Sequence, residues 1–251
     1  VKSVPTYNID GYFMPKQPMD IEAAGEQAQV PCLIGNNNAE MPAFAFLGGG
    51  APTIAGLSPA VENWLGVKAS EVLPLYGIHT DADIFGLPGY ALGGDIFIVY
   101  STWKWLDMQQ STSPKPVYRY KYCHPRPDMK QKDLVAGLAG GVQKKDDSAP
   151  AMPPTPGAVH SADIEYQMGN LPTNDVFDWK ADDYAVSEVF LKFFVNFIKT
   201  GNPNGLGLPT WDPINGKAVA PVMMIDRQSR QEILPDVEAR YRFIDKCLMK
   251  K

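Results

Sequence analysis

Cysteine, histidine and long apolar runs are scarce in this sequence. Its 251 residues include three cysteines, Cys32, Cys123 and Cys247, which lie far apart along the chain. Their spacing matches no zinc site or disulfide framework, and at most one disulfide could form. No apolar run approaches the roughly 18 residues of a membrane span, and no Asn-x-Ser/Thr acceptor for glycosylation occurs. These absences argue against a membrane-spanning protein, a zinc finger and a disulfide-rich secreted domain.

Positive charge is in the minority. The 23 Lys and Arg are outnumbered by 28 Asp and Glu, which gives a net charge of −5. No basic stripe follows from the sequence, so we expect neither a nucleic-acid partner nor attachment to an anionic membrane. The first residues, Val1-Lys2-Ser3-Val4-Pro5, contain neither a start methionine nor a signal peptide. We therefore expect a soluble protein whose sequence begins within a longer chain, with any signal peptide upstream and the compartment open.

Three segments are expected to form strands. With 45% hydrophobic and 20% charged residues, the chain is typical of a globular protein with a buried core. The segments 30–34 and 116–123 are rich in strand-forming residues and open into polar loops. The segment 218–225 is also apolar, but it contains Pro221, which predicts a strand at the edge of a sheet.

Three helices are expected to alternate with these strands. Apolar residues recur at three- and four-residue steps over 182–200, and Gly201 is expected to end that helix. A second helix is expected over 90–110, although Gly93-Gly94 weakens its start. A third, amphipathic helix is expected over 235–249. This alternation favours an α/β fold with a parallel sheet.

The segment 129–156 is a long insertion rich in polar and small residues. Loops of this length are uncommon inside compact domains and tend to be lids or flexible links. Because the insertion leads into His160, we expect it to shape or cover the mouth of a pocket there.

Three histidines can be weighed as a general base at neutral pH. His124 meets a Pro-Arg-Pro turn and His79 precedes a polar loop, so both are interpreted as structural. His160 precedes a short helical stretch that Ser161 could cap. From spacing alone, His160 is either a base displayed on a loop or, as the favoured interpretation, a histidine that bonds a neighbouring carbonyl.

Glu40 is the candidate partner of that base. It lies six residues after an apolar strand, either as a first-turn glutamate at a helix N-terminus or as a carboxylate that orients an imidazole. Sequence spacing does not choose between these roles. No credible nucleophile accompanies them, because Gly56-Leu57-Ser58 lacks the second glycine of a G-x-S-x-G turn.

Several segments, in the right order from Ile9 to Trp211, resemble the C-terminal half of the type-B carboxylesterase family, which includes para-nitrobenzyl esterases and cholinesterases. They are Ile9-Asp-Gly11, Val30-Pro-Cys-Leu-Ile-Gly35 with Glu40, Pro116-Val-Tyr-Arg-Tyr120, Gly157-Ala-Val-His-Ser-Ala-Asp-Ile-Glu-Tyr166, Phe197-Ile-Lys-Thr-Gly-Asn-Pro-Asn204 and Leu208-Pro-Thr-Trp211.

The resemblance implies an α/β-hydrolase with a Ser-Glu-His triad and an acyl-enzyme mechanism that needs no cofactor or metal. Glu40 would be the acid and His160 the histidine, whereas the serine and the oxyanion-hole glycines would lie before Val1. The chain departs from the family in having Ala39-Glu40-Met41 where Asp-Glu-Gly is usual. We expect a carboxyl oxygen of Glu40 about 2.6–3.2 Å from a ring nitrogen of His160.

The resemblance also implies that residues 1–251 are the C-terminal part of a single α/β-hydrolase domain, with 129–156 as an insertion within it. Its partners would be a small ester substrate and the N-terminal half of the same protein, without which the chain would be inactive. The alternative is a non-enzymatic, cholinesterase-like interaction protein.

The expected strands over 30–34 and 116–123 would be the last two main strands of that fold's parallel sheet. The first would then have an unpaired edge, and the helix over 182–200 would leave apolar surface open. We therefore expect the isolated chain to self-associate.

Overall fold

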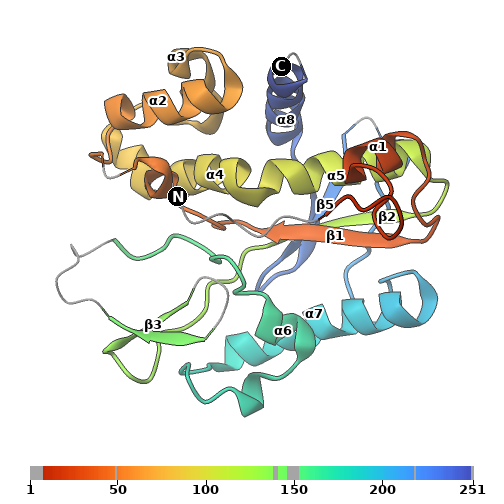
Figure 1. Cartoon of the computed structure of the whole chain (residues 1–251). Helices are drawn as coiled ribbons and strands as arrows, with labels where there is room; N and C mark the ends of the chain where they lie inside the picture. Colours follow the sequence, from red (N-terminus) through yellow and green to blue (C-terminus); the bar gives the residue numbers. More distant parts are fainter. Residues whose placement is uncertain (1–7, 49, 138–140, 146–152, 218, 250–251) are drawn as a thin grey trace.

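A sheet between two layers of helices organises the molecule (Figure 1). The computed structural model describes residues 8–48, 50–137, 141–145, 153–217 and 219–249. The main sheet has the strand order β1-β2-β5-β6, in which β1, β2 and β5 run parallel and β6 is antiparallel to β5. Its strands are β1 (Cys32–Asn37), β2 (Val117–Tyr122), β5 (Pro221–Ile225) and β6 (Arg230–Ile233).

Helices α2 to α5 and α8 lie on one side of the sheet, and α6 and α7 lie on the other. The helices are α1 (Pro18–Ala23), α2 (Ile54–Leu65), α3 (Ala69–Val72), α4 (Leu87–Gly94), α5 (Tyr100–Thr112), α6 (Ile164–Met168), α7 (Ala181–Thr200) and α8 (Pro235–Leu248). Short 3₁₀ turns occupy Ala43–Phe46, Leu73–Tyr76, Asp81–Phe85 and Leu171–Thr173. The α/β class expected from the sequence is confirmed.

The alternation of side chains along β2 explains how both faces of the sheet are covered. Tyr118, Tyr120 and Tyr122 point to one face and join the buried cluster that includes Phe190 and Phe193 of α7. Because successive side chains of a strand point to opposite faces, the intervening residues face the other layer. There Arg119 lies 3.7 Å from a carboxylate oxygen of Glu238 in α8. A strand with large side chains on both faces therefore forms the centre of the molecule.

The prediction that part of the apolar surface of α7 would lie open is wrong for its phenylalanines, although Ile198 of the same helix is 77% exposed. Phe190 and Phe193 are fully buried, and Phe194 and Phe197 are packed against the same cluster. The tyrosines of β2 and Trp211 of this chain supply the partner surface, so strands from elsewhere are not needed to cover this face. The predicted bounds of the helix were correct to one residue, and Gly201 ends it with φ of 73°, in the left-handed region that glycine adopts easily.

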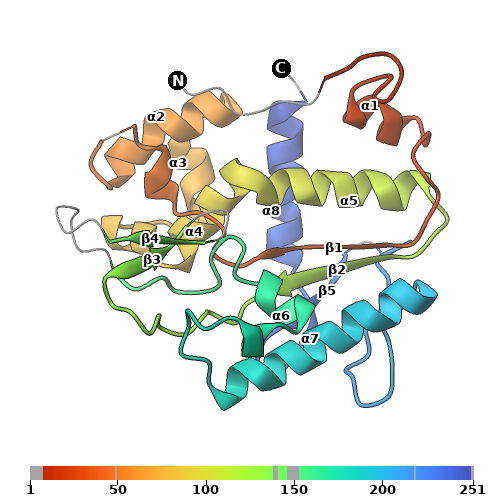
Figure 2. The same cartoon turned by 60° about the horizontal axis from the view of Figure 1, so that its bottom comes forward.

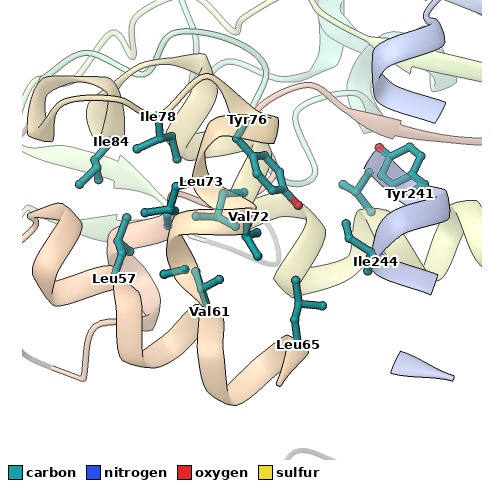
Figure 3. Close-up of a cluster of buried hydrophobic side chains, with 14 of the residues drawn as sticks. Leu57, Val61, Leu65, Val72, Leu73, Tyr76, Ile78, Ile84, Tyr241 and Ile244 are labelled. Atoms are coloured by element: carbon teal, nitrogen blue, oxygen red, sulfur yellow. The ribbon is translucent and has the colours of Figure 1, made fainter. Parts of the chain in front are cut away.

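The opposite layer has its own core. In Figure 3, Leu57, Val61 and Leu65 of α2 face Val72 of α3 and the residues that follow it, while Tyr241 and Ile244 of α8 approach from the side. These side chains are at most a few per cent exposed, and they connect the predicted C-terminal helix to the segment that follows β1.

Two expectations about the sheet need correction. The expected edge strand over 218–225 begins at Pro221 and lies between β2 and β6; residue 218 is outside the described residues. Pro221 is tolerated because it is the first residue of the strand and the pairing with β2 begins two residues later, at Met223. Strands β1 and β2, which were expected to be the last two main strands of the sheet, are therefore followed by β5 and β6. Within the described ranges, β1 pairs on one side only, so its other side is an edge, as expected.

The segment 129–156 contains a small hairpin. Strands β3 (Leu134–Ala136) and β4 (Val142–Lys144) pair antiparallel and lie side by side in Figure 2. Residues 138–140 and 146–152 of this segment lie outside the described residues. Whether the segment is an insertion into one domain stays a prediction.

The expected helix over 90–110 is one helical path with an irregular centre. Helix α4 runs into a π-helical segment, Asp95–Val99, which continues as α5. Such segments add one residue to the helix and rotate the side chains that follow. Here Asp95 is buried, with its carboxylate 3.1 Å from Nε of Arg240 and 2.8 Å from the hydroxyl of Tyr76, while Phe97 is about one third exposed.

Candidate active site

Glu40 is held by the strand that precedes it. The chain leaves β1 at Asn37 and turns back, so that the Asn37 amide donates to Oε1 of Glu40 at 2.6 Å. The carboxyl is 7% exposed, and burial raises its pKa although hydrogen bonds from Asn37 and His160 oppose that effect. Glu40 precedes the 3₁₀ turn that begins at Ala43, so it is not a first-turn glutamate. Its interpretation as a helix-terminus residue was wrong.

His160 is brought to Glu40 by backbone contacts between two distant segments. The Ala39 amide donates to the carbonyl of Ala158 at 3.0 Å, and the Ala158 amide donates to Oδ1 of Asn38 at 2.8 Å. Nδ1 of His160 then lies 2.6 Å from Oε2 of Glu40. The expected separation between the two groups is confirmed.

The imidazole of His160 is partly exposed. The His160 side chain is 27% exposed, compared with 7% for Glu40. Phe97 lies edge-on to the ring, with 5.1 Å between centroids and an angle of 82° between the ring planes. Since Nδ1 is the nitrogen that faces Glu40, Nε2 is the nitrogen left to exchange a proton with another group.

Two polar side chains hold the backbone on either side of His160. Asn37 donates from Nδ2 to the Val159 carbonyl at 2.7 Å and to Oδ1 of Asp163 at 3.1 Å. Arg126 donates to the carbonyl of Ser161 at 2.5 Å. The sequence interpretation did not single out Asn37 or Arg126 as site residues. Their positions just at or beyond the ends of β1 and β2 were the available signal.

Ser161 does not cap the helix that follows. Helix α6 begins at Ile164 with Asp163 at the N-cap position, and Ser161 has a positive φ of 63°. The expected cap was therefore wrong by two residues, because residues 160–163 form a turn before the helix starts.

A cavity of about 240 Å³ adjoins the Glu40–His160 pair. Both side chains line it, and most of the remaining wall is apolar. Ala136 and Gly137, from β3 and the residue after it, line the same cavity. The segment 129–156 therefore contributes to this pocket, as the sequence interpretation expected. The other lining residues are Ala39, Met41, Pro42, Tyr90 and Val159.

The other two histidines differ from His160. His124 is buried, with Nε2 2.8 Å from Oδ1 of Asp183, and its ring lies in the α7 layer. His79 is exposed, and its backbone amide donates to Asp83. Both positions agree with the structural interpretation. The three cysteines are free thiols.

No metal centre or membrane helix accompanies the pair in the described part of the chain. There, no three His, Cys, Asp or Glu side chains are grouped closely enough to hold a metal ion. Equally, none of the helices in those ranges combines the length and apolarity needed to cross a bilayer.

A partly exposed imidazole with a buried carboxylate on Nδ1 can exchange protons through Nε2. The carboxylate fixes the ring orientation, favours the tautomer with the proton on Nδ1 and stabilises the imidazolium that forms when Nε2 accepts a proton. Such a pair can deprotonate a hydroxyl that approaches Nε2 and later return the proton to a leaving group.

Comparison with known proteins relates most of the chain to one family. The sequence model described as "Carboxylesterase family" matches residues 90–243. An acylcarnitine hydrolase of Mus musculus is 26% identical over 97% of this chain and 41% of its own length. A carboxylesterase 4A of Bos taurus is 28% identical over 82% of this chain and 36% of its own length.

Solved structures show the same fold. A PNB esterase superposes with a TM-score of 0.61 at 18% identity, covering 94% of this chain and 42% of the esterase. A thermophilic PNB esterase gives 0.60 at 19% identity, covering 92% of this chain and 41% of that protein. The chain thus spans about two fifths of the length of these proteins, and it has an α/β-hydrolase fold with part of the sheet.

Proposed function

On the premise that this chain belongs to the carboxylesterase family, we propose that Glu40 and His160 are the acid and the base of a serine esterase that hydrolyses small carboxylic esters. The observation that carries this proposal is the 2.6 Å separation between Nδ1 of His160 and the buried Oε2 of Glu40. Nε2 of this partly exposed imidazole would take the proton of a serine hydroxyl as that oxygen attacks the ester carbonyl. It would then protonate the departing alcohol, and the same base would activate the water that releases the acid.

The nucleophile is proposed to come from a part of the protein outside these 251 residues. No Gly-x-Ser-x-Gly turn occurs in the sequence, and the chain covers two fifths of its relatives. The open edge of β1 supports this proposal, because a further parallel strand could pair there. Glu40 follows the same strand, so the missing segment would lie next to the acid. We also propose that the chain by itself hydrolyses no ester and tends to self-associate through this edge.

The test is ester hydrolysis by the longest polypeptide that contains these residues, with para-nitrophenyl acetate as substrate. His160→Ala should lower kcat by at least about a thousandfold, because His160 is the histidine that contacts Glu40 in the described part of the chain. His79→Ala is the matched control, since it removes an exposed histidine and should leave kcat unchanged. A His160→Ala protein within tenfold of wild type would refute the assignment, and an inactive wild type with an intact serine would favour the non-enzymatic alternative.

A further inference from the structure

The backbone next to His160 has an unusual conformation. Among the residues that the structure describes, Ser161 is the one residue other than glycine with a positive φ, at 63°. An L side chain in this left-handed region crowds its own backbone, so the conformation persists only where the surroundings impose it. The Ala162 amide closes the turn around Ser161 by donating to the Val159 carbonyl at 3.0 Å, and contacts from other segments can hold this conformation further.

Arg126 makes such a contact. Its Nη2 donates to the Ser161 carbonyl at 2.5 Å and to Oε2 of Glu165 at 2.5 Å. The side chain is 9% exposed, and its guanidinium lies over the ring of Phe177, 5.1 Å from the centroid. One nitrogen thus joins the turn after His160 to helix α6, which contains Glu165.

The backbone of Arg126 is itself stiff. Prolines flank it at positions 125 and 127, and each narrows the available backbone torsions: Pro125 fixes its own φ, and Pro127 keeps Arg126 out of the helical region. The guanidinium therefore extends from a rigid segment that directly follows β2.

We propose that Arg126 is a positioning residue for His160, which keeps the imidazole on Glu40 by holding the Ser161 carbonyl in place. The φ torsion of Ser161 is a rotation between the peptide that carries His160 and the carbonyl that Arg126 binds. If that carbonyl is released, φ can return to negative values, and the His160 side of the peptide moves. A hydrogen bond of 2.6 Å does not survive a displacement of an ångström.

The inference rests on the proposed function, because the alignment of His160 matters only if it is a base. Its test measures the Glu40–His160 hydrogen bond directly, so the positioning role of Arg126 and the proposed function can fail separately. The measurement is a ¹⁵N–¹H spectrum of the imidazole nitrogens in the 251-residue chain, which has three histidines to resolve. In the wild type, His160 should show a proton on Nδ1 that is protected from exchange with water.

Arg126→Gln should reduce the population of this paired form several-fold, and at most by the roughly tenfold that the cost of the left-handed region sets for an L residue, because the turn hydrogen bond from the Ala162 amide to the Val159 carbonyl stays in place. The double variant Arg126→Gln with Ser161→Gly should recover the signal, because glycine adopts a positive φ without crowding. Arg242→Gln is the matched control. Arg242 also bridges two carboxylates, those of Asp107 and Glu238, but it lies in α8, so its removal should change nothing at His160.

The bond between His124 and Asp183 reports in each variant whether the fold is intact. An unchanged His160 signal in Arg126→Gln would overturn the proposal. Loss of both the His160 and the His124 signals without recovery by Ser161→Gly would overturn it in favour of a purely structural role.

If Arg126→Gln does not fold, Ser161→Val becomes the test. A β-branched residue strongly disfavours positive φ, so the His160 signal should be lost although Arg126 is intact. Retention of the His160 signal in Ser161→Val would refute the proposal. An unprotected His160 in the wild type would instead refute the proposed function and the positioning role that depends on it.

Discussion

Gly93 in helix α4 lies directly against the backbone that follows Glu40. A Cβ atom at this position would be 2.2 Å from the carbonyl oxygen of Met41 and 2.5 Å from the amide nitrogen of Ala43. These atoms belong to the main chain, so they cannot rotate away as a flexible side chain could. Gly93→Ala should therefore push the loop that carries Glu40 away from α4.

Two opposing contributions set the magnitude. Replacing a helical glycine with alanine favours the helix by about 1 kcal/mol. Forcing an extra methyl group into a packed site costs about 1–3 kcal/mol. Because the clash at Gly93 is with main-chain atoms of Met41, Pro42 and Ala43, the upper end of that range applies, and we expect a net loss of about 2 kcal/mol in the free energy of unfolding.

Gly94 provides the matched control. A Cβ there would lie 3.3 Å from Cγ2 of Val99 and 3.6 Å from Cβ of Glu40, distances at which a small adjustment suffices. Gly94→Ala should therefore be neutral or slightly stabilising. Urea denaturation measures both changes, and the protected Nδ1 proton of His160 should weaken in Gly93→Ala alone. A Gly93→Ala protein at least as stable as Gly94→Ala would refute the reasoning from close packing.

Two further predictions concern charge and burial. Burial raises the pKa of Glu40 above its ordinary 4.5, so the folded state binds this proton more tightly than the unfolded state does. The wild type should therefore lose stability relative to Glu40→Gln as the pH rises from 4.5 through the raised pKa. Urea denaturation measures this loss, and the difference between the two proteins should not change with pH below 4.5. A difference between the two proteins that is constant with pH would contradict this. Phe190→Ala should lower the free energy of unfolding, measured by urea denaturation, by about 3–5 kcal/mol because the ring is fully buried. Ile198→Ala on the same helix should lower it little, because that side chain is 77% exposed. Equal losses in the two variants would be inconsistent with the packing of α7.

Local sequence patterns were sufficient for the regular elements. Strong three- and four-residue periodicity predicted α7, and β-forming residues predicted β1 and β2 to within a few positions. The same patterns were misleading at Pro221, because a strand's place in the sheet depends on its neighbours and not on its own residues. They also could not predict that Tyr118, Tyr120 and Tyr122 would cover α7.

The candidate site divides in the same way. His160 could be proposed from its residue type, its loop and the scarcity of other histidines, and Glu40 could be paired with it only through resemblance to a family. By itself, the sequence determined which side chains could supply a base and a carboxylate. The tertiary structure decided that these groups, 120 residues apart, lie 2.6 Å from each other. It also decided that Asn37 and Arg126 hold the backbone on either side of His160. Such hydrogen bonds to backbone carbonyls depend on which loops meet at the end of the sheet, and they leave no pattern in a single sequence.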